Sequence, residues 1–112
     1  MNPSLRSILA YIDRNYMRRL TLDDVAQHVF LNKTYVSQLF GKHLGISFVS
    51  YLEGVRIQKA QELLRDTDLS VTEVAAATGY ASQSYFTKVF KKRVGVTPLQ
   101  YRADIQAHSL LP

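Results

Sequence analysis

The segment SFVSYLEGVRIQKAQELLR, residues 47–65, is the part of the sequence around which the fold can be worked out. Ser47 is a residue type that caps helix starts, and no proline follows before Asp66. Ile57 lies outside the main apolar stripe, so we expect a long helix with apolar neighbours on more than one side. The stripe itself has the three- and four-residue spacing of an amphipathic helix, and it consists of Phe48, Tyr51, Leu52, Val55, Ala60, Leu63 and Leu64.

The sequences on the two sides of this helix are copies of each other. Val25-Ala26 recurs forty-nine residues later as Val74-Ala75, whereas the downstream matches recur after fifty, so the second copy has one additional turn residue. Each copy predicts a capped helix, a short turn and a second helix with an aromatic core, which is the helix-turn-helix pattern. Two ordinary helical hairpins in a bundle remain an alternative. The identities at the fifty-residue interval are Tyr35/Tyr85, Phe40/Phe90, Lys42/Lys92, Gly45/Gly95 and Tyr51/Tyr101.

Start and stop signals divide the rest of the chain into short helices. The expected starts are Ser4, Thr21, Asn32, Ser70 with Glu73 as a capping box, Ser82, and Thr97 followed by Pro98. No pair of alternating runs is separated by a hairpin turn, so no strands are expected. The sequence therefore predicts an all-α fold of seven helices. Two helix-turn-helix subdomains, residues 4–46 and 67–106, are joined by a long central helix within 47–66, and residues 107–112 form a frayed tail.

Composition narrows the classes of function. The chain of 112 residues has 14 Lys and Arg against 9 Asp and Glu, a net charge of +5 that permits an acidic partner. The absence of Cys excludes disulfides and cysteine nucleophiles and suits a reducing compartment. The three His residues lack metal-ligand spacing, and no catalytic set is found, so we expect no enzyme activity, metal or cofactor. No signal peptide or membrane-length apolar run is present, so we expect the cytoplasm and no membrane.

Acidic residues are absent from two windows of the sequence. None lies between Asp24 and Glu53, and none lies between Glu73 and Asp104. Each window contains the second helix of one copy, and a carboxylate close to a phosphate costs Coulomb energy. The windows therefore predict double-stranded DNA as the partner. The basic residues that we expect near phosphates are Lys42, Lys91, Lys92, Arg93 and Arg102.

The polar face of each second helix has the chemistry that base edges demand. Hydroxyl, amide and ammonium groups supply donors and acceptors for the edges of bases in the major groove. Two such helices can enter successive major grooves, about 34 Å apart on one face of DNA. In the first copy the helical wheel places Thr34, Ser37, Gln38 and Gly41 on this face, with Lys33 and Lys42 at its flanks. In the second copy it places Ser84, Thr87, Lys88 and Lys91 there, with Gln83 near the helix start.

These motifs resemble the DNA-binding domain of the AraC/XylS family of bacterial transcription regulators. The resemblance covers about residues 5–103 and includes YVSQLF at 35–40 and GISF at 45–48 in the first copy. In the second copy it includes GY at 79–80, SYF at 84–86, FKK at 90–92, GVTP at 95–98 and YR at 101–102. It implies two helix-turn-helix units joined by a long helix, with monomers that occupy two adjacent major grooves of a promoter site. The positions that it implies for base contacts are Lys33, Thr34, Ser37, Gln38, Gln83, Ser84, Thr87 and Lys88.

One residue departs from the family pattern, which has Gly in the first turn where this chain has Phe30. A bulky residue with positive φ there costs about 1–2 kcal/mol, so either the turn differs or packing of Phe30 compensates.

The resemblance also implies partners beyond DNA. The family's effector or receiver domain has no room in 112 residues, and the first half looks closest to the response-regulator members. We therefore expect the C-terminal piece of a larger regulator, with a stand-alone regulator as the alternative, and RNA polymerase as a further partner at the promoter. A protein-interaction module built of bundled helices is the competing function.

Overall fold

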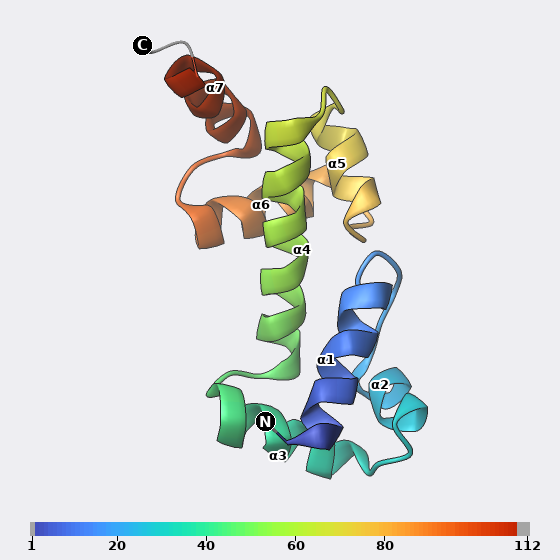
Figure 1. Ribbon diagram of the computed structural model, residues 1–112. Coiled ribbons are helices and arrows are strands. Elements are labelled where there is room, and N and C mark those ends of the chain that lie inside the picture. Colours follow the sequence, from blue (N-terminus) through green and yellow to red (C-terminus); the bar gives the residue numbers. More distant parts are fainter. Residues whose placement is uncertain (1, 110–112) are drawn as a thin grey trace. The chain divides into compact units, whose positions relative to one another are not determined.

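The computed structural model describes residues 2–109, which form seven α-helices and no β-strand (Figure 1). This confirms the predicted all-α class and the number of helices. In chain order the helices are α1 (Pro3–Asn15), α2 (Leu22–His28), α3 (Lys33–Leu44), α4 (Phe48–Asp66), α5 (Val71–Ala77), α6 (Gln83–Val94) and α7 (Pro98–Ser109).

The chain divides into two compact units, Met1–Val55 and Arg56–Pro112. Helix α4 begins in the first unit and ends in the second, and it supplies buried residues to both cores. The central helix is therefore a component of each unit in addition to being the connection between them. Ile57 is 3% exposed in the second core, which confirms the expectation that α4 has apolar neighbours outside its main stripe.

The first unit packs α1, α2, α3 and the beginning of α4 around Phe40, which is fully buried. The ring of Phe40 lies 5.9 Å from that of Phe48 and 5.7 Å from that of Tyr51, measured between centroids. Burial raises the pKa of Tyr51, and the carboxylate of Asp13 adds to the shift. The buried core consists of Leu5, Ile8, Ile12, Leu20, Val25, Ala26, Val36, Leu39, Phe40, Phe48 and Leu52.

The second unit repeats this arrangement. Phe90 is fully buried, and its ring centroid lies 5.6 Å from that of Tyr101, the counterparts of Phe40 and Tyr51 fifty residues earlier. Because the same pair of aromatic rings has nearly the same spacing in both units, the sequence repeat is also a repeat in packing. The buried core consists of Ile57, Ala60, Leu64, Val71, Val74, Ala75, Tyr80, Phe86, Val89 and Phe90.

Helix starts follow the predicted caps, with one correction. α1 begins at Pro3 and is capped by Asn2, whose Oδ1 accepts from the Leu5 N–H at 3.1 Å, so Ser4 is not its cap. Proline suits the first helical position because its φ is already helical and its missing N–H needs no partner. Thr21, Asn32, Ser70, Ser82 and Thr97 each accept a hydrogen bond from a backbone N–H of the first turn that follows.

Both α2 and α5 begin with a capping box, Thr21 with Asp24 and Ser70 with Glu73. The backbone N–H of each cap residue donates to the carboxylate and holds its pKa below the ordinary value. The sequence predicted the second box but not the first, whose acid is Asp where Glu or Gln is usual.

The two helix-turn-helix turns share one backbone path. Phe30 has φ of 57° and its counterpart Gly79 has φ of 93°. The next residue of each turn donates its backbone N–H to a carbonyl five residues earlier. Leu31 N–H donates to Ala26 O, and Tyr80 N–H donates to Ala75 O, both at 3.0 Å. The two turns thus have the same geometry, and packing of Phe30 does not compensate for its strain, because its side chain is 93% exposed. The connection between α5 and α6 consists of residues 78–82, and the connection between α2 and α3 consists of residues 29–32. The additional residue of the second copy therefore lies in this connection.

The last helix extends beyond the expected boundary at residue 106. α7 continues to Ser109, so residues 107–109 of the expected tail are helical. The rest of that tail, residues 110–112, lies outside the described residues.

Candidate nucleic-acid interface

The second helix of the first unit, α3, presents a polar face opposite its buried face. Val36, Leu39 and Phe40 point into the core. Thr34, Ser37, Gln38 and Gly41 are all exposed, as the helical wheel predicted. Because the helix is fixed by its core side, this polar face is held in a definite orientation.

Two hollows flank the exposed face of α3. One, of about 470 Å³, is lined by Gln38 and Lys42 of α3 together with Asn2 and other residues. The other, of about 460 Å³, is lined by Ser37 with Thr21 and Val49, which lie at the starts of α2 and α4. Gln38 and Ser37, two of the residues predicted to contact bases, therefore each line one of these hollows.

The equivalent helix of the second unit, α6, has the same two-sided character. Phe86, Val89 and Phe90 are buried, and Ser84 and Lys88 are exposed. Thr87 is half-buried, so only part of its side chain lies on the polar face. The structure thus brings together Gln83, Ser84, Thr87 and Lys88 along the outer side of one helix.

Most of the basic residues predicted near phosphates lie at helix ends. Lys42 is exposed in the last turn of α3, and Lys91, Lys92 and Arg93 are exposed in the last turn of α6. Cations are favourable there because the helix dipole leaves partial negative charge at its C-terminus. Their position therefore has a structural reason in addition to the predicted role in binding phosphate.

Arg102 occupies a different environment from the one predicted. Its Nε donates to Leu64 O at 3.0 Å, and its Nη2 donates to Thr67 O at 3.2 Å. These carbonyls lie at the end of α4, where no intrahelical donors are available. The guanidinium therefore caps α4, and the phosphate contact of Arg102 stays a prediction. Carbonyl oxygens attract a cation as phosphates do, so a place in an acid-free window is compatible with either role.

The first residue of each second helix contacts the first helix of its own unit. Lys33 Nζ lies 3.7 Å from Asp23 Oδ1, and the Thr72 hydroxyl donates to Gln83 Oε1. Lys33 and Gln83, both predicted to face bases, are thus held by intramolecular partners. Sequence reasoning missed Asp23 and Thr72 as parts of the site. Their matching positions in the repeat were the available signal.

Two tyrosines on these helices were also not singled out from the sequence. Tyr35 is 42% exposed and Tyr85 is 54% exposed, at matching positions in α3 and α6. The ring of Tyr85 lies 6.0 Å from that of Tyr80, between centroids. Tyr35 lines the same hollow as Gln38 and Lys42, and Tyr85 holds the matching position in α6.

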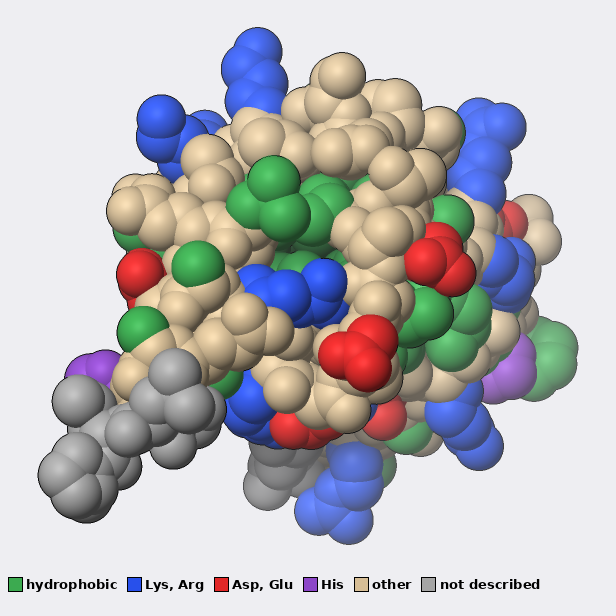
Figure 2. Space-filling model, turned by 90° about the horizontal axis from the view of Figure 1, so that it is seen from above, with side chains coloured by type: hydrophobic (Ala, Val, Ile, Leu, Met, Phe, Trp, Pro, Cys, Tyr) green, Lys and Arg blue, Asp and Glu red, His purple; other side chains and the backbone are tan. Residues whose placement is uncertain are grey.

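Charges of both signs lie together on other parts of the surface. Figure 2 shows a face where Lys and Arg side chains project around the rim and Asp and Glu side chains lie among them. Arg65 and Asp66 are one example of such mixing, with Nε and Oδ1 2.8 Å apart. The exclusion of acids is therefore a property of the two windows and not of the whole surface.

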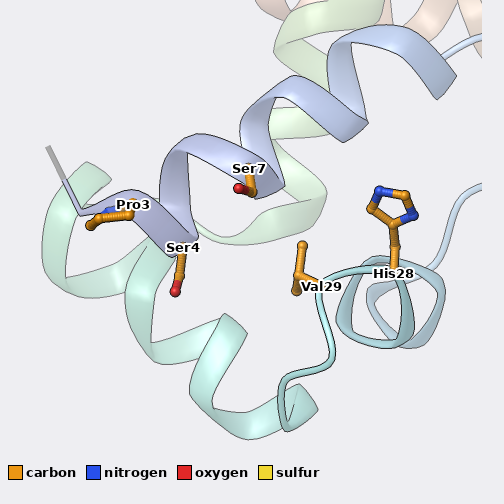
Figure 3. A pocket seen from close by; sticks show the side chains of 5 residues that line it. All are labelled: Pro3, Ser4, Ser7, His28 and Val29. Atoms are coloured by element: carbon orange, nitrogen blue, oxygen red, sulfur yellow. The ribbon is translucent and has the colours of Figure 1, made fainter.

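A pocket of about 330 Å³ lies between α1 and the end of α2 (Figure 3). Ser4 and Ser7 of α1 line it together with His28 and Val29. The His28 ring stacks on Tyr11 with centroids 4.0 Å apart, which joins the two helices. The pocket contains none of the residues predicted to contact DNA, and its hydroxyls and single imidazole form no catalytic arrangement.

In the part of the chain that the structure describes, no group of three or more His, Cys, Asp or Glu residues is placed to hold a metal ion. None of the helices within residues 2–109 combines the length and the apolar character that a membrane span requires.

Comparison with known proteins assigns the fold to a family. Residues 25–104 match the helix-turn-helix domain family designated HTH_18. The regulatory protein PocR of Salmonella typhimurium is 40% identical over 108 residues, which are 96% of this chain and 36% of PocR. The chain thus spans about a third of the length of that relative.

Solved structures give the same assignment. The C-terminal domain of AraT, a response regulator from Geobacillus stearothermophilus, matches with a TM-score of 0.89 and 39% identity over 92% of this chain and 86% of that one. A transcriptional regulator from Chromobacterium violaceum, described as containing an AraC-type DNA-binding domain, matches with a TM-score of 0.88 and 26% identity over 92% of each chain. The chain belongs to the family of AraC-type helix-turn-helix domains, as the resemblance in the sequence indicated.

Proposed function

We propose that this chain is the DNA-binding domain of a sequence-specific transcription regulator, with α3 and α6 as its two recognition helices. The observation that carries the proposal is the repeated polar face. In two units of the same fold, the second helix is fixed by a buried aromatic core and exposes hydroxyl, amide and ammonium groups inside an acid-free window. Membership of the AraC-type family supports it, because PocR is a regulatory protein and AraT is a response regulator.

In this proposal the side chains divide into two roles. Residues on the outer faces of the helices contact base edges and choose the sequence, whereas cations at the helix ends contact phosphates and provide affinity. The base-contacting set is Lys33, Thr34, Ser37 and Gln38 in α3, and Gln83, Ser84, Thr87 and Lys88 in α6. The phosphate-contacting set is Lys42, Lys91, Lys92 and Arg93. Each helix enters one of two adjacent major grooves of a promoter site.

Further partners follow from the family and remain part of the proposal. AraT is described as a response regulator whose C-terminal domain resembles this chain, which supports a receiver or effector domain as a partner. RNA polymerase is the expected partner at the promoter, and binding to a bacterial chromosome places the protein in the cytoplasm. We propose no enzyme activity for the chain, because it belongs to a family of helix-turn-helix domains whose matched relatives include transcription regulators.

The salt dependence of DNA binding tests the proposal. Each phosphate contact releases counterions, so removing one cation lowers the slope of log K against log[salt] by about 0.9. We expect the double variant Lys91→Ala/Lys92→Ala to lose about twice that slope in titrations of a random duplex. Arg14→Ala removes an exposed charge of α1, outside the windows, and should retain the wild-type slope. Absence of affinity for duplex DNA at low salt would favour the protein-interaction module instead.

A selection from random DNA separates base contacts from phosphate contacts. Gln38 is exposed and lines one of the two hollows beside α3. An amide can pair with adenine through two hydrogen bonds worth about 1–3 kcal/mol of discrimination. Gln38→Ala should relax the preference at one position of one half-site and leave non-specific binding almost unchanged. Identical motifs from the wild type and the variant would remove Gln38 from the base-contacting set.

A further inference from the structure

The hydrogen bond between Thr72 and Gln83 joins the two helices of the second helix-turn-helix unit. Thr72 is the second residue of α5 and Gln83 is the first residue of α6, and both are exposed. The Thr72 hydroxyl donates to Oε1 of Gln83 across the turn. The side chain of Gln83 is therefore held from the side of α5, at the place where the recognition helix begins.

The first unit has a contact at the same place. Asp23 is the second residue of α2, Lys33 is the first residue of α3, and their charged groups lie 3.7 Å apart. Asp23 precedes Thr72 by forty-nine residues and Lys33 precedes Gln83 by fifty, the two intervals of the repeat. Two different chemistries, an ion pair and a neutral hydrogen bond, therefore make the same connection. This recurrence indicates that the connection is a feature of the unit and not an accident of one pair.

The chemistry of the amide gives the contact a consequence for recognition. A Gln side chain that pairs with adenine presents both its oxygen and its NH₂ group, to N6–H and N7. In Gln83 the oxygen accepts from Thr72 and faces α5, which directs the NH₂ group away from α5. The oxygen keeps a second lone pair, but it faces α5, so the NH₂ group is the part of the amide that is turned away from α5. Guanine presents two adjacent acceptors, N7 and O6, and is therefore a better match than adenine.

We propose that Thr72 is a positioning residue that holds the amide of Gln83 as a hydrogen-bond donor and so selects guanine over adenine at one position of the site. This inference rests on the proposed function, in which α6 enters a major groove. Thr72 itself contacts no base. Its hydroxyl acts through Gln83. In the first unit, the ion pair of Lys33 with Asp23 needs no control of side-chain orientation, because a Lys ammonium group is a donor in every orientation.

Selection from a random duplex library by four proteins tests the proposal. Gln83→Ala identifies the position, because its preference is lost there alone. At that position the wild type should select guanine. Thr72→Val, which replaces the hydroxyl with a methyl of similar size, should reduce the guanine preference at least about fivefold and admit adenine, since the freed amide can pair with it. Thr72→Ser keeps the hydroxyl and should restore the wild-type preference.

Each contrary result has a distinct meaning. Selection of adenine by the wild type at this position, or an unchanged guanine preference in Thr72→Val, overturns the positioning role. A uniform loss of binding at every position in Thr72→Val, at an unchanged melting temperature, also overturns it, because the hydroxyl would then act on affinity alone. Failure of the wild type to enrich any sequence overturns the proposed function and this inference with it.

Discussion

Replacing Arg102 with Ala distinguishes a cap of α4 from a contact to DNA phosphate. The guanidinium makes two hydrogen bonds, to Leu64 O at 3.0 Å and to Thr67 O at 3.2 Å. A hydrogen bond with a charged donor contributes about 1.5–3 kcal/mol, and we take the lower end for each because the side chain is only half-buried. Arg102→Ala should therefore lower the free energy of unfolding by about 3 kcal/mol.

Urea unfolding followed by far-ultraviolet circular dichroism measures this loss. Lys88→Ala removes the same charge from an exposed position of α6 and should change stability by no more than about 0.5 kcal/mol. Arg102→Lys keeps the charge but cannot reproduce the fork of two N–H groups, so an intermediate loss is expected. The salt slope of DNA binding, measured where Arg102→Ala is still folded, should equal that of the wild type. Unchanged unfolding together with a slope lowered by about 0.9 would refute the capping role and support the phosphate contact.

Three further predictions concern stability. Phe30→Gly should raise the free energy of unfolding by up to about 1 kcal/mol, because relief of about 1–2 kcal/mol of left-handed strain exceeds the entropy cost of Gly, which is about 0.5–1 kcal/mol. A lower melting temperature for Phe30→Gly than for the wild type would show that the exposed ring contributes packing. Phe90→Ala should cost about 3–5 kcal/mol, with Phe90→Leu much milder, since the ring is fully buried; similar midpoints for the two variants would contradict this. The Ser70 N–H holds the pKa of Glu73 below its ordinary 4.5, so this carboxylate stabilises the fold above about pH 4.5 and the contribution is lost as pH falls through the lower folded pKa. Stability measured from pH 7 to 3 should therefore fall less steeply in Glu73→Gln, and equal steepness would contradict the assignment.

Features that depend on neighbours in the sequence could be predicted without the structure. The periodicity of α4, the caps at Thr21, Asn32 and Ser70, and the stops at Gly45 and Gly95 all act within a few residues. The repeat then extended these local features to a pair of equivalent units. Buried and exposed faces of α3 and α6 followed from the same 3.6-residue period, because a helix with one apolar stripe has only one way to face a core.

The strain at Phe30 could be predicted only in part from the sequence. Its place in the turn was visible in the sequence, and the structure confirmed the positive φ. Whether its ring packs on the protein depends on which other elements come near the turn, and the structure shows that the ring remains 93% exposed.

Contacts between side chains distant in sequence were decided only by the tertiary structure. Arg102 donates to carbonyls 38 and 35 residues away, and its position in an acid-free window could not distinguish these oxygens from those of a phosphate. The ion pair of Lys33 with Asp23 and the hydrogen bond from Thr72 to Gln83 each cross a turn between two helices. Each bond requires two groups to be placed within a few tenths of an ångström by elements that pack independently, whereas sequence spacing specifies positions only along one helix or one turn. The sequence by itself therefore determined the helices, their faces and the family, and packing decided which polar groups on those faces are held by the protein and which are left to meet a partner.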